Sequence, residues 1–169
     1  SFVLAWTSPD PGASSSVALA DVDGDGRLDL AVARPNDGDQ LWRGVPSGFA
    51  LFWTDPEPGH SREVAWGDVD GDGDPDLAIG CEGPVRILRN DGGMLVAGWV
   101  TQDEDFTEAV ALGDADGDGR LELLVGNSEK HRHRSRGATE SAPDYQPLLD
   151  QGLIQVEPLT YIRGRSLPH

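Results

Sequence analysis

Short apolar runs recur along the first three quarters of the chain, and glycine, aspartate, asparagine or proline separates them. One stretch shows the pattern clearly, with EVAWGDV at 63–69, PDLAIGC at 75–81, VRILRN at 85–90 and MLVAGWV at 94–100. Runs of this length and composition, bounded by turn formers, predict four consecutive β-strands. Other runs, such as VALA at 17–20 and LELLV at 121–125, are apolar on both faces, as in a sheet covered on both sides. No amphipathic helix is expected in residues 1–127.

The pattern is repeated. DVDGDGRLDL begins at Asp21, and close copies begin at Asp68 and Asp114, so the spacings are 47 and 46 residues. A tryptophan lies 15 residues before each of these aspartates, at Trp6, Trp53 and Trp99. We expect these tryptophans to pack in the core or between units. A period of this size is typical of four-stranded propeller blades. The sequence therefore predicts an all-β fold of three blades, at about 1–44, 45–90 and 91–137, followed by a non-repeat tail at 138–169.

Three blades form only half of a propeller, because closed propellers usually contain four to eight. Each end of such a half exposes an apolar face, which favours association. We expect a homodimer of six blades, in which the strand at residues 2–8 of one copy completes the third blade of the other. The alternative is that the sequence is a fragment of a longer propeller.

The acidic segments share the spacing D-x-D-x-D-G-x-x-[DE], which places carboxylates at positions 1, 3, 5 and 9 of a tight loop. Oxygen ligands in such number select Ca²⁺, and a backbone carbonyl at position 7 would add another. The alternative is a set of solvated turns without metal. The recurrence favours metal, and three Ca²⁺ per chain are expected. Because each loop joins consecutive strands, structural stapling is favoured over a regulatory switch.

Composition narrows the choice of function. The formal net charge is −17 and the isoelectric point about 4.3, so nonspecific nucleic-acid binding is not expected. A single cysteine, Cys81, excludes an intrachain disulfide and is expected to be a buried apolar residue. No run reaches the roughly 20 apolar residues of a membrane span. No signal peptide is visible in the given sequence.

With these motifs in view, residues 1–130 resemble FG-GAP-like (VCBS-type) repeats, which build integrin-α-like β-propellers in surface proteins. The segments that carry the resemblance are VALADVDGDGRLDLAVARPNDGDQLWRG and VAWGDVDGDGDPDLAIGCEGPVRILRN. The resemblance implies that each loop binds calcium. It assigns as ligands Asp21, Asp23, Asp25 and Asp29 with the carbonyl of Arg27; Asp68, Asp70, Asp72 and Asp76 with the carbonyl of Asp74; and Asp114, Asp116, Asp118 and Glu122 with the carbonyl of Arg120. Glu122 departs from the usual aspartate, which alters the expected affinity of the third site.

The tail departs from the repeat. KHRHRSR at 130–136 replaces an apolar strand, and its His131 and His133 make a weak candidate for a transition-metal site. Residues 145–169 resemble a short segment of PhoH-like ATPases. The chain has no G-x-x-x-x-G-K-[ST] motif, so no ATPase activity is expected. The basic cluster could contact an anionic partner, which is the weakest functional hypothesis.

The favoured function is a calcium-stabilised binding, adhesion or scaffold module of extracellular or cell-envelope origin, with a protein or glycan ligand. The exposed members among Trp42, Trp53 and Trp66 are the first candidates for ligand contact. The alternative is a calcium-dependent hydrolase of glycans or phosphoesters, which would need an open metal position. No nucleophile elbow is present, and His60 is expected to be a solvated loop residue. The chain is therefore not expected to be an enzyme.

Overall fold

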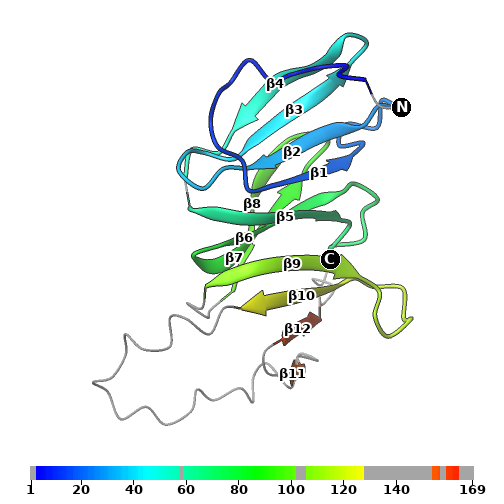
Figure 1. The fold of residues 1–169 in the computed structure, drawn as a ribbon. Helices are drawn as coiled ribbons and strands as arrows, with labels where there is room; N and C mark the ends of the chain where they lie inside the picture. Colours follow the sequence, from blue (N-terminus) through cyan, green and yellow to red (C-terminus); the bar gives the residue numbers. More distant parts are fainter. Residues whose placement is uncertain (1–2, 58, 102–105, 128–153, 157–158, 164–169) are drawn as a thin grey trace.

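Three antiparallel β-sheets follow one another along the chain and stack face to face (Figure 1). The computed structural model describes residues 3–57, 59–101 and 106–127, together with the backbone of 154–156 and 159–163. These residues contain no helix. In particular, the described part of the chain has no helix with the length and apolarity needed to cross a membrane. The predicted all-β class is confirmed.

The first two sheets each contain four strands in sequence order. The first consists of β1 (Ser16–Ala20), β2 (Asp29–Ala33), β3 (Gln40–Val45) and β4 (Gly48–Thr54). The second consists of β5 (Ser61–Gly67), β6 (Asp76–Cys81), β7 (Gly83–Asn90) and β8 (Leu95–Val100). These four strands coincide with the four apolar runs from which the second unit was predicted. Each of the two sheets therefore has the strand order of a propeller blade.

The third sheet is completed by the tail. Its β9 (Thr107–Gly113) and β10 (Glu122–Asn127) correspond to the first two strands of the other sheets. Beside β10 lies β12 (Leu159–Arg163), and β11 (Ile154–Val156) pairs with β12. The sequence predicted that this unit lacks an outer strand of its own, whereas the structure supplies both outer positions from the same chain. Residues 130–136, with the histidine pair, lie outside the described residues, as does most of the segment that resembles PhoH-like ATPases.

The N-terminal segment differs from its predicted form. Residues 3–14 form no strand and instead cross the first sheet (Figure 1). Trp6 makes edge-to-face contacts with Trp42 and Phe49, at centroid distances of 5.5 and 5.3 Å. Gly48 makes room for the indole, because a Cβ there would lie 2.3 Å from Trp6 Cδ1. This aromatic packing fixes the segment on the chain's own first sheet.

The three tryptophans that recur in register have different environments. Trp6 packs against the first sheet as described, and Trp53 on β4 is half-buried. Trp99 on β8 is 45% exposed, so the prediction of core packing is wrong for this residue. Cys81, by contrast, is buried as predicted, and burial raises the pKa of its thiol.

The core consists of two clusters between the sheets. The first joins Ala31 and Ala33 of the first sheet to Val64, Leu77 and Ile79 of the second. The second cluster joins the next pair of sheets and contains Ala78, Val85, Ile87, Val110, Leu123 and Val125. In the first cluster, the larger side chains of the second sheet pack on Ala31 and Ala33 of the first sheet. In the second cluster, larger side chains of the third sheet pack with Ala78 of the second. The stacking holds the loops after β1, β5 and β9 in equivalent places.

Candidate metal centre

Each acidic loop joins the first strand of a sheet to the second, between β1 and β2, β5 and β6, and β9 and β10. The chain can turn this tightly because the two glycines of each loop adopt positive φ, for example 71° at Gly24 and 85° at Gly26. Such angles strain residues that carry a Cβ. The glycine pairs of the other loops adopt the same conformation, so the three loops share one backbone geometry.

The first carboxylate of each loop organises the turn by accepting backbone hydrogen bonds. Asp21 accepts from the N–H of Asp25 at 3.0 Å and of Gly26 at 2.8 Å. Asp68 and Asp114 accept from the equivalent N–H groups, and each also accepts from a glycine N–H at 2.7 Å. The first carboxylate therefore fixes the backbone of the turn that follows it.

The ninth position is the buried anchor of the loop. Asp29 is 1% exposed, and its two oxygens accept from the N–H of Val22 at 3.0 Å and of Gly44 at 2.7 Å. Asp76 is likewise buried and accepts from the N–H groups of Val69 and Asn90. The carboxylate therefore ties the start of its own loop to the third strand of the sheet. Burial raises the pKa of Asp76, and the negative charges of the same loop add to this.

Positions 1, 3 and 9 converge in all three loops. In each triad, one ligand oxygen per residue lies within 4.8 Å of the others. The triads are Asp21, Asp23 and Asp29; Asp68, Asp70 and Asp76; and Asp114, Asp116 and Glu122. Oxygens that share a Ca²⁺ at about 2.3–2.6 Å lie no more than about 5 Å apart, so this donor set fits the ion. Glu122 keeps the anchoring role despite its longer side chain, and it accepts from the N–H of Ala115 at 2.7 Å.

The fifth position is not part of these triads. Asp25 accepts from the N–H of Arg27 at 2.9 Å and forms an ion pair with the Arg27 guanidinium. Asp72 and Asp118 cap their turns in the same way, through the N–H of the residue two positions later. Each of these carboxylates stabilises the turn by accepting a hydrogen bond from the backbone N–H two residues later. Coordination by position 5, and by the carbonyls at position 7, stays a prediction.

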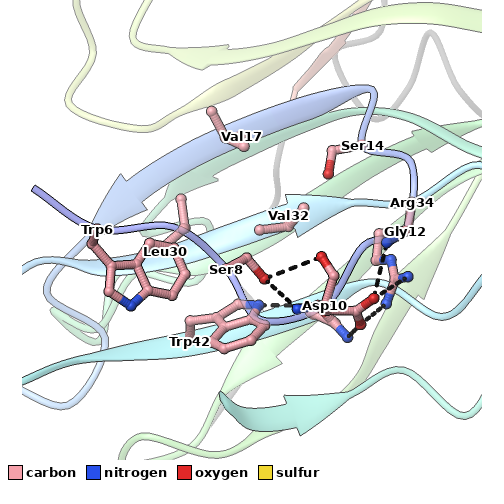
Figure 2. Close-up of a pocket in the computed structure, with 11 residues that line it drawn as sticks. Trp6, Ser8, Asp10, Gly12, Ser14, Val17, Leu30, Val32, Arg34 and Trp42 are labelled. Atoms are coloured by element: carbon pink, nitrogen blue, oxygen red, sulfur yellow. Dashed lines mark hydrogen bonds and ion pairs between the residues drawn. The ribbon is translucent and has the colours of Figure 1, made fainter. Parts of the chain in front are cut away.

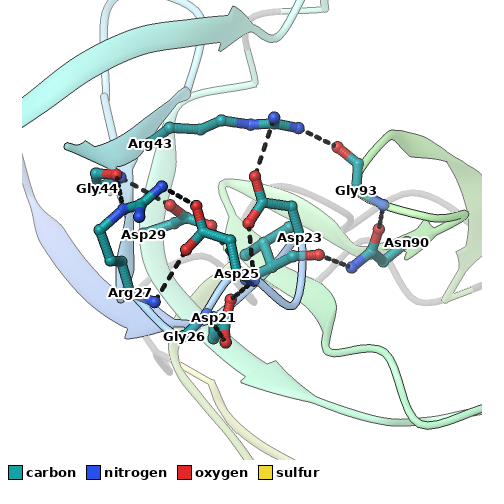
Figure 3. Close-up of polar contacts among 11 residues, drawn as sticks. Asp21, Asp23, Asp25, Gly26, Arg27, Asp29, Arg43, Gly44, Asn90 and Gly93 are labelled. Carbon is teal, nitrogen blue, oxygen red and sulfur yellow. Dashed lines mark hydrogen bonds and ion pairs between the residues drawn. The ribbon is translucent and has the colours of Figure 1, made fainter.

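Two arginines that the sequence did not mark as site residues contact the aspartate at position 3 of the first two loops. Arg43 on β3 forms an ion pair with Asp23, with 2.9 Å between Nη1 and the carboxylate, and its Nη2 donates to the carbonyl of Gly93 at 3.1 Å (Figure 3). The same guanidinium lies over the Phe52 ring. The equivalent Arg89 on β7 lies 3.7 Å from Asp70. The guanidinium groups offset part of the negative charge of the first two loops. Only the recurrence of arginine at this strand position signals the role in the sequence.

Asn90 connects the first loop to the second sheet. Its side chain is fully buried, and Nδ2 donates to the carbonyl of Val22 at 2.8 Å. Its Oδ1 accepts from the N–H of Gly93 at 2.7 Å. The equivalent residue of the first sheet is Gly44, which has no side chain, so the repeat could not reveal this contact. The first loop is thus held by two sheets rather than one.

A separate buried charge cluster lies between the first two sheets. Asp39 accepts from Ser61 Oγ at 2.7 Å and from the N–H of Arg34 at 2.8 Å. Arg86 pairs with Asp55 and lies 3.8 Å from Asp39. Burial raises the pKa of Asp39 above its ordinary value. Arg86 thus faces two buried carboxylates, Asp39 and Asp55, as in a structural ion pair. Among the described residues, these carboxylates belong to no group of three that could hold a metal ion.

The candidates for ligand contact or catalysis are dispersed. Trp42 is 4% exposed beneath Trp6, and Trp53 and Trp66 are half-buried. His60 is exposed, and its Nδ1 lies 2.8 Å from the carbonyl oxygen of Pro35. Among the described residues, the convergent groups of three or more metal-binding side chains are the three loop triads.

Comparison with known proteins agrees with the repeat structure. Residues 21–79 and residues 68–125 each match the family model described as FG-GAP-like repeat. Together the two matches cover more than half of the chain, and they include all three loops. No protein of curated function matches the chain.

Proposed function

The chain belongs to the FG-GAP-like repeat family, and on that basis we propose that it is a calcium-stabilised β-propeller module for binding or scaffolding. The observation that carries the proposal is the convergence of three carboxylate oxygens in each of three equivalent loops. Such a cluster is costly without a cation, because like charges at this separation repel.

Each loop is proposed to hold one Ca²⁺, so the chain takes three. The carboxylates of positions 1, 3, 5 and 9 and the carbonyl of position 7 are the proposed ligands. The bound ion would neutralise the loop and join two strand ends. Asp29 and Asp76 support this stapling by holding the first and second loops against their sheets, because each accepts hydrogen bonds from backbone N–H groups.

We place the module outside the cell or in the cell envelope, where sites with dissociation constants of about 0.1–1 mM remain filled. The loops and blade edges would offer a surface to a protein or glycan ligand. Binding is favoured over catalysis because each triad lies in a loop pinned between two strands of one sheet. The working form is proposed to be a dimer.

The test is calcium binding by isothermal titration calorimetry, together with thermal unfolding in calcium and in EDTA. The wild-type chain is expected to bind three Ca²⁺ and to unfold at a clearly higher temperature when they are bound. Asp70→Asn removes one member of the central triad and should reduce the number of bound ions to two.

Asp91→Asn is the matched control. Asp91 is exposed in the turn after β7 and belongs to no triad, so this variant should still bind three ions. Equal unfolding temperatures in calcium and EDTA, with no heat of binding for the wild type, would overturn the proposal. Equal stoichiometry in the two variants would remove Asp70 from the ligands.

A further inference from the structure

The first sheet has an apolar face that no other sheet covers within the described residues. Val17 and Leu19 on this face are 61% and 53% exposed, and Leu28 beside them is 55% exposed. Leu30 and Val32 lie on the same face, because each is paired across β1 and β2 with Leu19 and Val17. The face is therefore a continuous apolar surface rather than a few scattered residues.

Strand register shows what such a face is built to contact. The pair Val17↔Val32 corresponds to Val64↔Ile79 in the second sheet, in the same positions before and after the acidic loop. Val64 and Ile79 are 4% and 0% exposed, because they pack on Ala31 and Ala33 of the preceding sheet. The corresponding pair of the third sheet, Val110↔Val125, packs on the second sheet in the same way. Each blade thus places this face on the small-residue face of the blade before it.

Within the described residues, the complementary small-residue face is left uncovered at the other end of the stack of sheets. Ala18↔Ala31 in the first sheet corresponds to Ala65↔Ala78 in the second and to Ala111↔Leu124 in the third. Ala78 is fully buried, whereas Ala111 is exposed and Leu124 is half-buried. The described part of the chain therefore presents one uncovered face of each kind, at opposite ends of its stack of sheets.

The N-terminal segment supports the presence of a further blade beside the first sheet. Asp10 accepts from Arg34 Nη1 at 2.8 Å and from Gln40 Nε2 at 2.9 Å, and Gln40 accepts from Trp42 Nε1 at 3.0 Å (Figure 2). The N–H of Gly12, assisted by Gln40 and Arg34, lowers the pKa of the Asp10 carboxyl. The segment leaves a cavity of about 180 Å³ against the sheet and does not cover Val17.

The next connection along the chain docks in the same way. Asp55 pairs with Arg86, which occupies the position on β7 that Gln40 occupies on β3. Glu57, the counterpart of Asp10, lies 3.9 Å from the same arginine. That connection arrives from the outermost strand of the preceding blade. Residues 8–10 therefore lie on the first sheet as residues 55–57 lie on the second, beside the place where a neighbouring sheet packs.

From these equivalences, and resting on the proposed propeller function, we infer that a second copy of this chain occupies the free face of the first sheet. The third sheet of the second copy places Ala111 and Leu124 against Val17, Leu19 and Val32, and the reciprocal contact closes a ring. The two contacts are identical and each joins unlike faces, so two copies give six blades, within the range of known propellers. No exchange of strands is needed, since the third sheet already has its outer strands.

The test is the oligomeric state by native mass spectrometry and sedimentation, in calcium, with a variant on each face. Val17→Lys and Ala111→Glu each place an unpaired charge in both contacts of the ring. Each is expected to weaken dimerisation at least about a hundredfold. Val96→Lys is the control, because Val96 is exposed on the outer strand β8 and lies on neither free face. It should remain dimeric.

Mixing the two variants distinguishes the arrangement. A mixed pair has one unaltered contact and one that pairs lysine with glutamate, so mixing should restore dimers that neither variant forms alone. Dimers of Ala111→Glu alongside monomers of Val17→Lys would show pairing through the first sheets only, and would overturn the inference. A wild-type monomer up to about 100 µM, or open chains longer than two copies, would also overturn it.

Calcium binding is measured on the same samples. A monomer that binds three Ca²⁺ contradicts the dimer and leaves the proposed function intact. A dimer that binds none contradicts the calcium proposal alone. Circular dichroism of each variant shows whether a monomeric state reflects the lost contact or a lost fold, and a second substitution, Leu19→Lys, tests the same face if Val17→Lys does not fold.

Discussion

Replacing Asp29 by asparagine tests whether the ninth position of the loop stabilises the fold independently of metal. The carboxylate is 1% exposed, and its two oxygens accept from the N–H groups of Val22 and Gly44. An asparagine has one acceptor oxygen, so its amide NH₂ must face one of these two donors. The substitution keeps the size and shape of the side chain and removes one hydrogen bond.

The expected cost follows from that geometry. A hydrogen bond to a charged acceptor contributes about 1.5–3 kcal/mol, and leaving a buried N–H without an acceptor costs about 1–3 kcal/mol. These two descriptions overlap, so we expect Asp29→Asn to lower the free energy of unfolding by about 1.5–3 kcal/mol. Asp25→Asn should cost less than about 1 kcal/mol, because the Asp25–Arg27 pair is exposed and asparagine can still accept from the Arg27 N–H.

The assay is urea unfolding followed by tryptophan fluorescence over a series of free calcium concentrations. Calcium linkage makes the unfolding free energy rise with calcium concentration, by about 2.7 kcal/mol per site at a hundred times the dissociation constant. Asp29→Asn should lower the whole curve, including its low-calcium end. Asp25→Asn should lower that end by less than about 1 kcal/mol. Equal unfolding free energies of Asp29→Asn and wild type at low calcium would refute the anchoring role.

Three further predictions follow from the contacts between sheets. Asn90→Ala removes the buried bond to Val22 and should cost about 2–3 kcal/mol in the same urea assay; a loss below about 0.5 kcal/mol would contradict the link between sheets. Arg43→Gln removes a positive charge beside Asp23 and should tighten calcium binding at the first loop about three- to tenfold by calorimetry, whereas weaker binding would mean that Arg43 positions the ligand instead. Because burial raises the pKa of Asp39 in the folded chain, its contribution is fully present below about pH 3.8 and is lost as the pH rises through the folded value. The stability of wild type relative to Asp39→Asn, measured in saturating calcium, should therefore fall as the pH rises above about 3.8, and a rise would refute the assigned direction.

The strands could be predicted because their information is local. In the second unit each strand is a run of Val, Leu, Ile and Trp between turn formers, and the structure places β5, β6, β7 and β8 on these runs. The loops could also be predicted, since Gly24 and Gly26 permit a turn that brings Asp21 and Asp23 together. Spacing along the chain is sufficient where the contacts are only a few residues apart.

The remaining features depend on distant partners. Trp6, Trp53 and Trp99 occupy one register, yet the first packs on Trp42 and the last is exposed, because burial depends on which strand covers each ring. The ion pair of Asp25 with Arg27 is likewise not visible in the loop spacing, because it depends on the direction of two side chains. The tail strands β11 and β12 could not be foreseen, because their sequence does not resemble the repeat and their place depends on the free edge of β10.

The bond from Asn90 to Val22 also has a consequence for the order in which the protein folds. It spans 68 residues, and the bond from Arg43 to Gly93 spans 50, so both close long loops of chain. Closing such loops costs more entropy than pairing neighbouring strands of one sheet, because the loops are longer. During synthesis the first acidic loop emerges before the other two, yet its last contacts must wait for β7 and the turn after it. The loop that is made earliest is therefore completed only when the second sheet has folded against the first.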